Sequence, residues 1–164
     1  MWLSISATTR EPRPGEIEGV HYFFIGADRF EALERTSGLL EWAEVHGNCY
    51  GTPRAEVEAK LNEGVDVVLE IDPQGAAQVK RLMPDSVLIF VTAPSMDELR
   101  RRLQRRGSET KEQVERRLRT AEEEMLVAGT YDFVVQNDDV RRATDELVRI
   151  IESDATSGAH PKEA

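Results

Sequence analysis

The sequence predicts an α/β fold built on a parallel sheet. Short apolar runs alternate along the chain with segments of helical periodicity, which is typical of parallel strands covered by helices on both faces. The runs are "WLSISA" (2–7), "DVVLEID" (66–72), "SVLIFVTA" (86–93) and "YDFVVQN" (131–137). With 164 residues, of which 40 % are hydrophobic and 32 % charged, the chain has the size and composition of one globular domain.

The region from about residue 11 to residue 65 interrupts this alternation. The runs "GVHYFF" (19–24) and "GLLEWAEV" (38–45) are typical of strands. We expect them to form a smaller antiparallel or mixed piece that is inserted into the main sheet.

Helices are predicted from apolar periodicity together with residues typical of helix ends. Asp28 with Glu31 and Ser95 with Glu98 have the spacing of capping boxes, which indicate two helix starts. The predicted helices cover residues 29–38, 54–63, 96–107, 111–129 and 139–153.

The helix over 54–63 has signals at both ends. Thr52 and Pro53 are an expected N-cap and first helical residue, and Gly64 is expected to close the helix. Beyond the last helix, the polar tail at 153–164 is expected to be disordered.

Charge and cysteine content narrow the class of protein. The 31 acidic and 21 basic residues give a net charge of -10, which argues against an arginine-rich nucleic-acid binder. Cys49 is the single cysteine, so no internal disulfide forms, and "MWLSISATTR" lacks the features of a secretory signal. No stretch approaches the ~20 apolar residues that span a bilayer. We expect a cytoplasmic protein that contacts neither nucleic acid nor membrane.

The segment "SATTREPRPGE" (6–16) is a candidate phosphate site. Arg10 and Arg13 flank a turn stiffened by Pro12 and Pro14, so two guanidinium groups are held close together, each able to grip a phosphate with paired hydrogen bonds. The alternative is a solvated turn in which the arginines pair with nearby glutamates.

The segment "EWAEVHGNCYGTPR" (41–54) is a candidate base-recognition site. A half-buried carboxylate at Glu41, beside Trp42, can accept from N1–H and the exocyclic amine of guanine at once, and adenine offers no such pair of donors. The alternative is that Glu41 is exposed and that Thr52 only caps a helix.

The run "VVLEIDPQGA" (67–76) ends a strand with acidic residues. Asp72 is expected beyond the carboxyl end of the strand, where open α/β sheets bind ligands, and Glu70 is expected to point the same way. An acidic side chain there can reach a base edge or a magnesium-bound water. The alternative is that Asp72 caps the next helix.

The segment "RRRLQRRGSETKEQVERRLR" (100–119) is dense in arginine. Arg102 and Arg106 share a helix face, and Arg117 comes from the next helix, so these side chains can close over polyphosphate. The alternative is a solvated surface with Glu-to-Arg pairs along the helix, namely Glu112 with Arg116 and Glu115 with Arg119.

In this order, the segments resemble those of guanylate kinase, and the resemblance extends from Trp2 to about Glu152. It implies a P-loop-type nucleoside monophosphate kinase core within residues 1–152, with a mixed α/β GMP-binding region at about 6–65 and a helical lid at about 94–122. The matching segments are "SATTREPRPGEIEGVHYFF", "LLEWAEVHGNCYGTPR", "LEIDPQGA", "RRGSETKEQVERRL" and "YDFVVQNDD".

The resemblance also implies roles for single residues. Residues matching the positions that hold the GMP phosphate are Ser6, Arg10, Arg13, Tyr22 and Tyr50, and those matching the guanine-reading positions are Glu41, Thr52 and Asp72. Arg106 and Arg117 match arginines that stabilise the transferring phosphoryl group, and Asn137 matches a residue near the adenine of ATP. The implied reaction is in-line transfer from magnesium-bound ATP to GMP.

Two local departures from the family pattern leave the liganding side chains in place. Cys49 stands where an aromatic residue is common, and Pro73 stands beside Asp72 where a bulky residue is usual. Pro73 removes a backbone donor next to the site.

The larger departure is that the motif G-x-x-x-x-G-K-[ST] does not occur, and none of the lysines follows a glycine loop. A strand, the loop and a helix, about 30 residues in such units, are therefore expected to be missing, which predicts weak kinase activity and a destabilised fold. A start placed at an internal Met1 and a shortened, non-catalytic relative are competing explanations. The lysines are Lys60, Lys80, Lys111 and Lys162.

Two functions are therefore consistent with the sequence. One is a guanylate kinase, and the other is a non-catalytic module that binds GMP or a phosphorylated partner through Arg10, Arg13, Tyr22 and Tyr50. Retention of Arg106, Arg117 and Asn137 favours the kinase, because a binding module needs no transfer or adenine-side residues.

Overall fold

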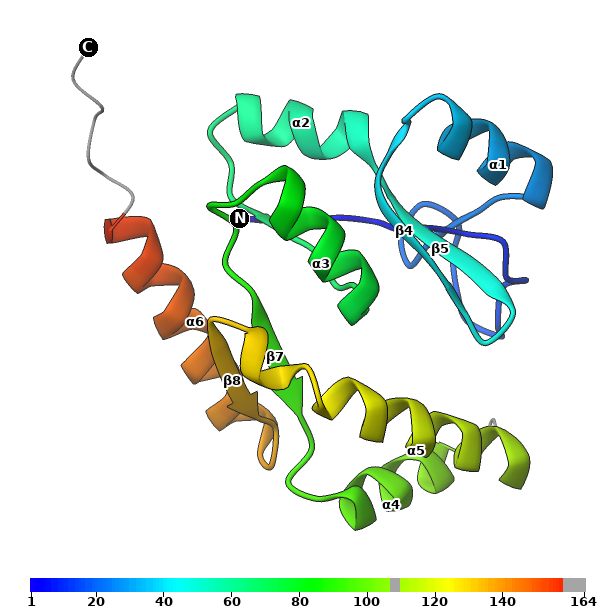
Figure 1. The fold of residues 1–164 in the computed structure, drawn as a ribbon, viewed down its shortest axis with the longest axis vertical. Coiled ribbons are helices and arrows are strands. Elements are labelled where there is room, and N and C mark those ends of the chain that lie inside the picture. The colour runs from blue at the N-terminus through cyan, green and yellow to red at the C-terminus, as the bar shows by residue number, and fades with distance from the viewer. Residues whose placement is uncertain (107–109, 158–164) are drawn as a thin grey trace. The chain divides into compact units, whose positions relative to one another are not determined.

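The computed structural model describes residues 1–106 and 110–157, and the chain divides into two compact units, Met1–Ser86 and Val87–Ala164. The fold is α/β, as predicted, and parallel strand pairs occur in both units (Figure 1). Among the described residues, no helix is long and apolar enough to cross a membrane.

The first unit contains a four-stranded mixed sheet, so the inserted piece predicted from residues 19–24 and 38–45 is present. The strand order is β3-β2-β5-β4, with β2 and β3 parallel and the other neighbours antiparallel. The strands are β2 (Ala7–Thr8), β3 (Phe23–Phe24), β4 (Leu39–Val45) and β5 (Asn48–Pro53). His46 and Gly47 both have positive φ, of 53° and 81°, which gives the β4–β5 hairpin a turn that matches the strand twist.

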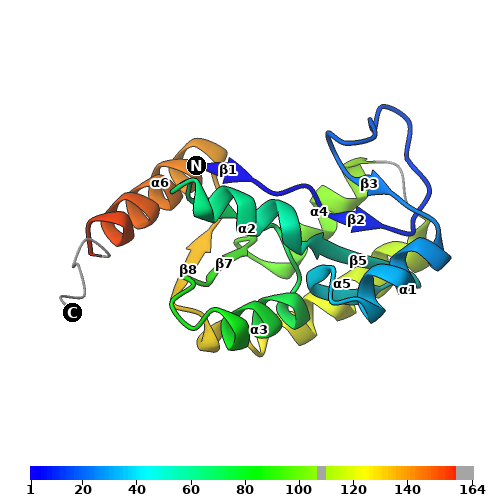
Figure 2. The same cartoon turned by 90° about the horizontal axis from the view of Figure 1, so that it is seen from above.

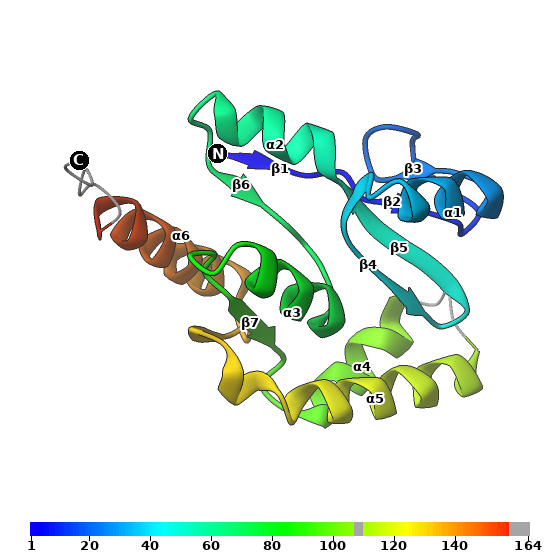
Figure 3. The same cartoon turned by 45° about the horizontal axis from the view of Figure 1, so that its top comes forward.

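A second, two-stranded sheet in this unit pairs β1 (Trp2–Leu3) with β6 (Val67–Val68) in parallel, and Figure 3 shows both strands beside α2. These strands are shorter than the predicted runs at 2–7 and 66–72. The helices of the unit are α1 (Ala27–Arg35), α2 (Arg54–Asn62) and α3 (Pro73–Leu82).

Strand β4 is buried on both sides, which places its side chains in two cores. Leu39 packs with Phe30 of α1, whereas Leu40 packs with Val57 of α2 and Val79 of α3. A register irregularity between Leu39 and Glu41 accompanies this change of side. Glu41 is therefore carried on a strand with little room to move.

The second unit pairs β7 (Ile89–Thr92) and β8 (Phe133–Gln136) in parallel. Val135 of β8 is fully buried against Ala143 and Ile150 of α6, and Figure 2 shows α6 beside this strand. Leu103, Val114 and Leu118 form a separate core between α4 and α5. The helices are α4 (Met96–Arg106), α5 (Lys111–Met125), the 3-10 turn η1 (Ala128–Thr130) and α6 (Val140–Ser157).

Several predicted helix ends are wrong. Helix α1 starts two residues before Arg29, with Gly26 as its N-cap, and Asp28 lies in its first turn rather than capping it. Thr52 and Pro53 end β5, a strand the sequence analysis did not predict, and α2 starts at Arg54.

Two other signals for helix ends are confirmed. Ser95 Oγ accepts from Glu98 N at 3.2 Å at the start of α4, and Gly64, with φ of 73°, follows the end of α2. Helix α6 continues to Ser157, past the predicted start of the tail, and residues 158–164 of that tail lie outside the described residues.

Candidate functional site

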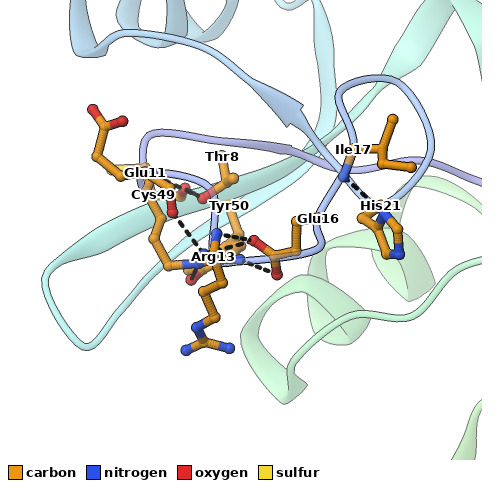
Figure 4. Close-up of polar contacts among 9 residues, drawn as sticks. Thr8, Glu11, Arg13, Glu16, Ile17, His21, Cys49 and Tyr50 are labelled. Atoms are coloured by element: carbon orange, nitrogen blue, oxygen red, sulfur yellow. Dashed lines mark hydrogen bonds and ion pairs between the residues drawn. The ribbon is translucent and has the colours of Figure 1, made fainter. Parts of the chain in front are cut away.

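Arg10 is held just after β2 by hydrogen bonds to Glu11, Glu16 and Tyr50, three residues that are labelled in Figure 4. Its Nη2 and Nη1 atoms donate to Oε1 and Oε2 of Glu16 at 2.8 and 3.0 Å. Nη1 also donates to the Glu11 carbonyl at 2.7 Å, and Nε donates to Oη of Tyr50 at 3.2 Å. These bonds use the N–H groups of the guanidinium except one on Nη2, so the side chain is fixed in place.

Glu16 makes a further bond, accepting from the backbone N of Arg13 at 2.6 Å. The hydrogen bonds from Arg10 and from the Arg13 backbone lower the pKa of Glu16 from 4.5 to about 2. This carboxylate therefore stays ionised at neutral pH and ties the two arginines of the loop together.

Arg13 differs from Arg10. Its guanidinium makes no hydrogen bond or ion pair with any residue that the structure describes, and Figure 4 shows it directed away from Glu16. The alternative considered above, in which arginines of this loop pair with glutamates, therefore holds for Arg10. The donors of the Arg13 guanidinium are therefore not used by any residue that the structure describes.

Aromatic rings pack against the Arg10 guanidinium. Its Cζ lies 5.4 Å from the ring centre of Tyr22 and 5.7 Å from that of Phe24, within the range of cation–π contacts. Tyr22 and Tyr50 pack edge to face at 5.9 Å, and burial raises the pKa of Tyr22. The structure thus brings together three of the residues matched to phosphate binding, Arg10, Tyr22 and Tyr50.

Ser6, another predicted phosphate ligand, lines a cavity of about 390 Å³ together with Tyr22 and Glu70. This volume lies within the range of small-molecule sites. Ser4 also lines the cavity, and its hydroxyl oxygen is buried without a hydrogen-bond partner among the described residues. Polar groups in this cavity are therefore available to a ligand.

Glu41 is a buried acid, with 4 % of its surface exposed. The β4–β5 register places it opposite Thr52, whose hydroxyl donates to Oε1 of Glu41 at 2.6 Å. Burial raises the pKa of Glu41, the bond from Thr52 opposes that rise, and the charge of Asp72 adds to it. Thr52 is fully buried, and its hydroxyl bonds this carboxylate instead of capping a helix.

Asp72 is the N-cap of α3, as the alternative interpretation predicted. Its Oδ1 accepts from Gly75 N at 2.9 Å, and its Oδ2 accepts from Gln74 Nε2 at 3.1 Å. The same side chain is close enough to Glu41 to raise its pKa, so the cap and the buried acid are neighbours. Glu70 lies outside β6 and is exposed.

The remaining predicted residues lie in the second unit. Asn137 follows β8, and its Oδ1 is buried without a hydrogen-bond partner among the described residues. Arg117 lies half-buried on α5, and Arg106 ends α4 with a side chain outside the described part of the chain.

The arginine-rich helices show ion pairs that differ from those expected. Arg102 donates to Glu98 at 2.8 Å, one turn earlier on α4. Glu115 of α5 pairs with Arg100 of α4, and the charge of Arg119, the expected partner, helps to lower the pKa of Glu115. The Arg100–Glu115 pair connects the two helices, and the Arg102–Glu98 pair fixes Arg102 to its own helix.

Sequence reasoning did not single out Glu16. Its position three residues after Arg13, at the end of a Pro-Gly turn, was the available signal, but which glutamate would pair with which arginine depended on the turn geometry. Among residues 1–106 and 110–157, no group of three or more His, Cys, Asp or Glu side chains is placed to hold a metal ion.

Comparison with known proteins identifies close relatives. The sequence profile of the family "Guanylate kinase" matches residues 1–154. Guanylate kinase of Synechococcus sp. (strain CC9311) is 49 % identical over 147 residues, covering 90 % of this chain and 77 % of the relative. That of Thermus thermophilus is 48 % identical over 164 residues, covering 100 % and 74 %. The crystal structure of guanylate kinase from Anaplasma phagocytophilum superposes with a TM-score of 0.80 at 37 % identity, covering 93 % of this chain and 74 % of that one.

Proposed function

Because this chain belongs to the guanylate kinase family, whose activity is the phosphorylation of GMP with ATP, we propose that its first unit binds GMP as the acceptor. One observation carries the proposal. The β4–β5 hairpin carries both the buried Glu41–Thr52 pair and Tyr50, the partner of Arg10, so a base-reading group and a phosphate-binding group share one rigid element.

Glu41 reads the guanine edge. Its buried carboxylate accepts hydrogen bonds from N1–H and from the exocyclic amine, and these donors offset the cost of keeping the acid ionised away from water. Adenine presents no donor at N1, so one hydrogen bond to the carboxylate is not formed. Thr52 holds Oε1 in place, and Asp72 supplies a second acceptor beside it.

Arg13 and the Arg10 cluster hold the phosphate. The donors of Arg13 and the remaining N–H of Arg10 bind its oxygens, together with the hydroxyls of Tyr22, Tyr50 and Ser6. Glu16 is a positioning residue, because it fixes Arg10 through both oxygens and holds the loop that carries Arg13. The phosphate thus meets an oriented guanidinium rather than a mobile one.

The second unit serves the ATP side. Asn137 offers a buried carbonyl oxygen that lacks a partner among the described residues, which suits the amino group of adenine. An oxygen of the GMP phosphate attacks the γ-phosphorus of ATP, and the bond from that phosphorus to the bridging oxygen breaks, giving GDP and ADP. Arg106 and Arg117 stabilise the charge on the transferring group, and the segment 94–122 closes as a lid that excludes water.

Magnesium bound to the phosphates of ATP would neutralise part of their charge.

A second candidate function is a non-catalytic module, because the contacts that carry the proposal above all lie in the first unit and serve GMP alone. In this case the chain binds GMP, or another phosphorylated partner, and transfers nothing.

One experiment separates the two. The full chain is incubated with ATP, Mg²⁺ and GMP, GDP is measured by ion-exchange chromatography, and GMP binding is measured in parallel by calorimetry. GDP formation that is lost in Arg117→Ala supports the kinase. GMP binding without GDP formation supports the binding module, and no GMP binding overturns both.

A further inference from the structure

Gly75 lies between the two carboxylates to which guanine reading is assigned. It is buried in the first turn of α3, and its N–H donates to Oδ1 of Asp72 at 2.9 Å. A Cβ at this position would overlap Oε2 of Glu41, and it would lie 3.0 Å from Cδ of Glu41 and 3.3 Å from Oδ1 of Asp72. Because Gly75 is helical, the need for glycine is steric and concerns the close approach of Glu41.

Gln78 lies one turn further along α3 and fixes the strand that carries Glu41. Its Nε2 donates to the Trp42 carbonyl at 2.6 Å, and its Oε1 accepts from Trp42 N at 3.2 Å. The side chain thus pairs with β4 as a neighbouring strand would. Val79 packs on Leu40, so α3 contacts β4 on either side of Glu41.

The two carboxylates need such a restraint. Glu41 and Asp72 come from different elements and carry like charges, and the charge of Asp72 already raises the pKa of Glu41. Repulsion favours their moving apart. Guanine presents its donors along one rigid edge, so a small change in the separation of the acceptors misaligns at least one hydrogen bond.

We propose that Gly75 and Gln78 are positioning residues that set the separation of the Glu41 and Asp72 carboxylates, and thereby the preference of the site for guanine over adenine. This inference rests on the proposed function, in which Glu41 and Asp72 read the base. Neither residue is required to touch the nucleotide.

The test uses calorimetric binding of GMP and AMP to the full chain and to Gly75→Ala. The added methyl group displaces Glu41, so we expect GMP affinity to fall by about 10- to 100-fold, the effect of losing a hydrogen bond to a charged group, with AMP affinity unchanged. Gly129→Ala is the matched control, because its Cβ meets no atom within 4 Å, and it should leave both affinities unchanged.

A second substitution keeps the proposal testable if Gly75→Ala folds poorly. Glu41→Asp withdraws the carboxylate by one methylene, so Gly75→Ala should lower the melting temperature less in the Glu41→Asp background than in the wild type. Gln78→Ala leaves the helix backbone intact but removes both hydrogen bonds to the Trp42 backbone in β4, and it should also lower the ratio of GMP to AMP affinity.

The outcomes separate this inference from the proposed function. A wild-type chain that binds GMP and AMP equally contradicts guanine reading itself. A wild-type chain that prefers GMP, with the same preference in folded Gly75→Ala and Gln78→Ala, overturns the positioning role and leaves guanine reading intact.

Discussion

The carboxylate of Glu16 holds the guanidinium of Arg10 with both of its oxygens, at 2.8 and 3.0 Å, and accepts from the backbone of Arg13 with one of them. As a result, the two arginines of this loop differ in how their guanidinium groups are bonded. Arg10 is fixed by protein groups, whereas the guanidinium of Arg13 has no bonded partner in the part of the chain that the structure describes.

Glu16→Gln should weaken GMP binding without removing a ligand of the phosphate. The amide keeps the shape of the side chain but loses the charge and one acceptor, so Arg10 becomes mobile. We expect the affinity for GMP to fall by about tenfold, which is typical when a residue that orients a liganding side chain is lost. Calorimetry with GMP checks this. Glu11→Gln is the control, because only the backbone carbonyl of Glu11 contacts Arg10.

The Glu16–Arg10 pair should also make stability depend on pH. The pKa of Glu16 is lowered from 4.5 to about 2, so its contribution to the free energy of unfolding is present above pH 4.5 and is lost as pH falls toward 2. The stability difference between wild type and Glu16→Gln, measured by urea unfolding, should shrink over that interval. A difference that is constant down to pH 2 contradicts the pairing.

Arg13→Ala should cost GMP affinity and leave stability nearly unchanged, because its guanidinium has no ion pair to lose among the described residues. We expect a loss of about 1.5–3 kcal/mol in binding, the range for a hydrogen bond to a charged group. Arg10→Ala should cost a similar amount in binding and, in addition, lower the melting temperature, because it leaves Glu16 unpaired. Equal melting temperatures for the two variants would argue against this difference in bonding.

Glu41→Gln should weaken GMP binding more than AMP binding, and we expect the ratio of GMP to AMP affinity to fall by about 10- to 100-fold.

The effect of Glu41→Gln on stability has a defined sign. The pKa of Glu41 is raised in the folded protein, so its contribution to stability is greatest below its unfolded pKa and is lost as pH rises through the folded pKa. Wild type should therefore lose stability relative to Glu41→Gln on going from pH 4 to pH 8, as urea unfolding would show.

Asn137→Ala should weaken ATP binding and leave GMP binding unchanged. The buried Oδ1 atom has no hydrogen-bond partner among the described residues, and adenine supplies one, so we expect a loss of about 0.5–1.5 kcal/mol, the net value of a neutral hydrogen bond. Titration of a fluorescent ATP analogue measures it. The exposed Asp139 is a control position, as Asp139→Asn, and an unchanged ATP affinity in Asn137→Ala would remove this residue from the adenine site.

The fold class is predictable from sequence because it rests on local patterns. The apolar runs around residues 89–92 and 133–136 do form parallel strands, whereas phosphate binding by Arg10 and Arg13 stays a prediction. The strands are shorter than the runs, since hydrogen bonding to a neighbour, rather than hydrophobicity, decides where a strand ends.

The partners of several side chains could not be predicted from sequence, because they depend on contacts between distant residues. Thr52 precedes proline and a helix, which is typical of a cap, but the β4–β5 register brings its hydroxyl to Glu41 instead. Arg119 follows Glu115 by four residues, but the packing of α4 on α5 also places Arg100 within ion-pair distance of Glu115. Gly75 carries no signal in sequence, because its role appears only when β4 is placed against α3.

The most direct test of the account is calorimetric titration of the wild-type full chain with GMP and with AMP under the same conditions. The two nucleotides share the phosphate, so the Arg10 and Arg13 contacts are equal for both, and only the base edge differs. Guanine recognition by Glu41 predicts that GMP binds at least about tenfold more tightly, as loss of a hydrogen bond to a charged group implies. Equal affinities would contradict guanine recognition by the buried Glu41.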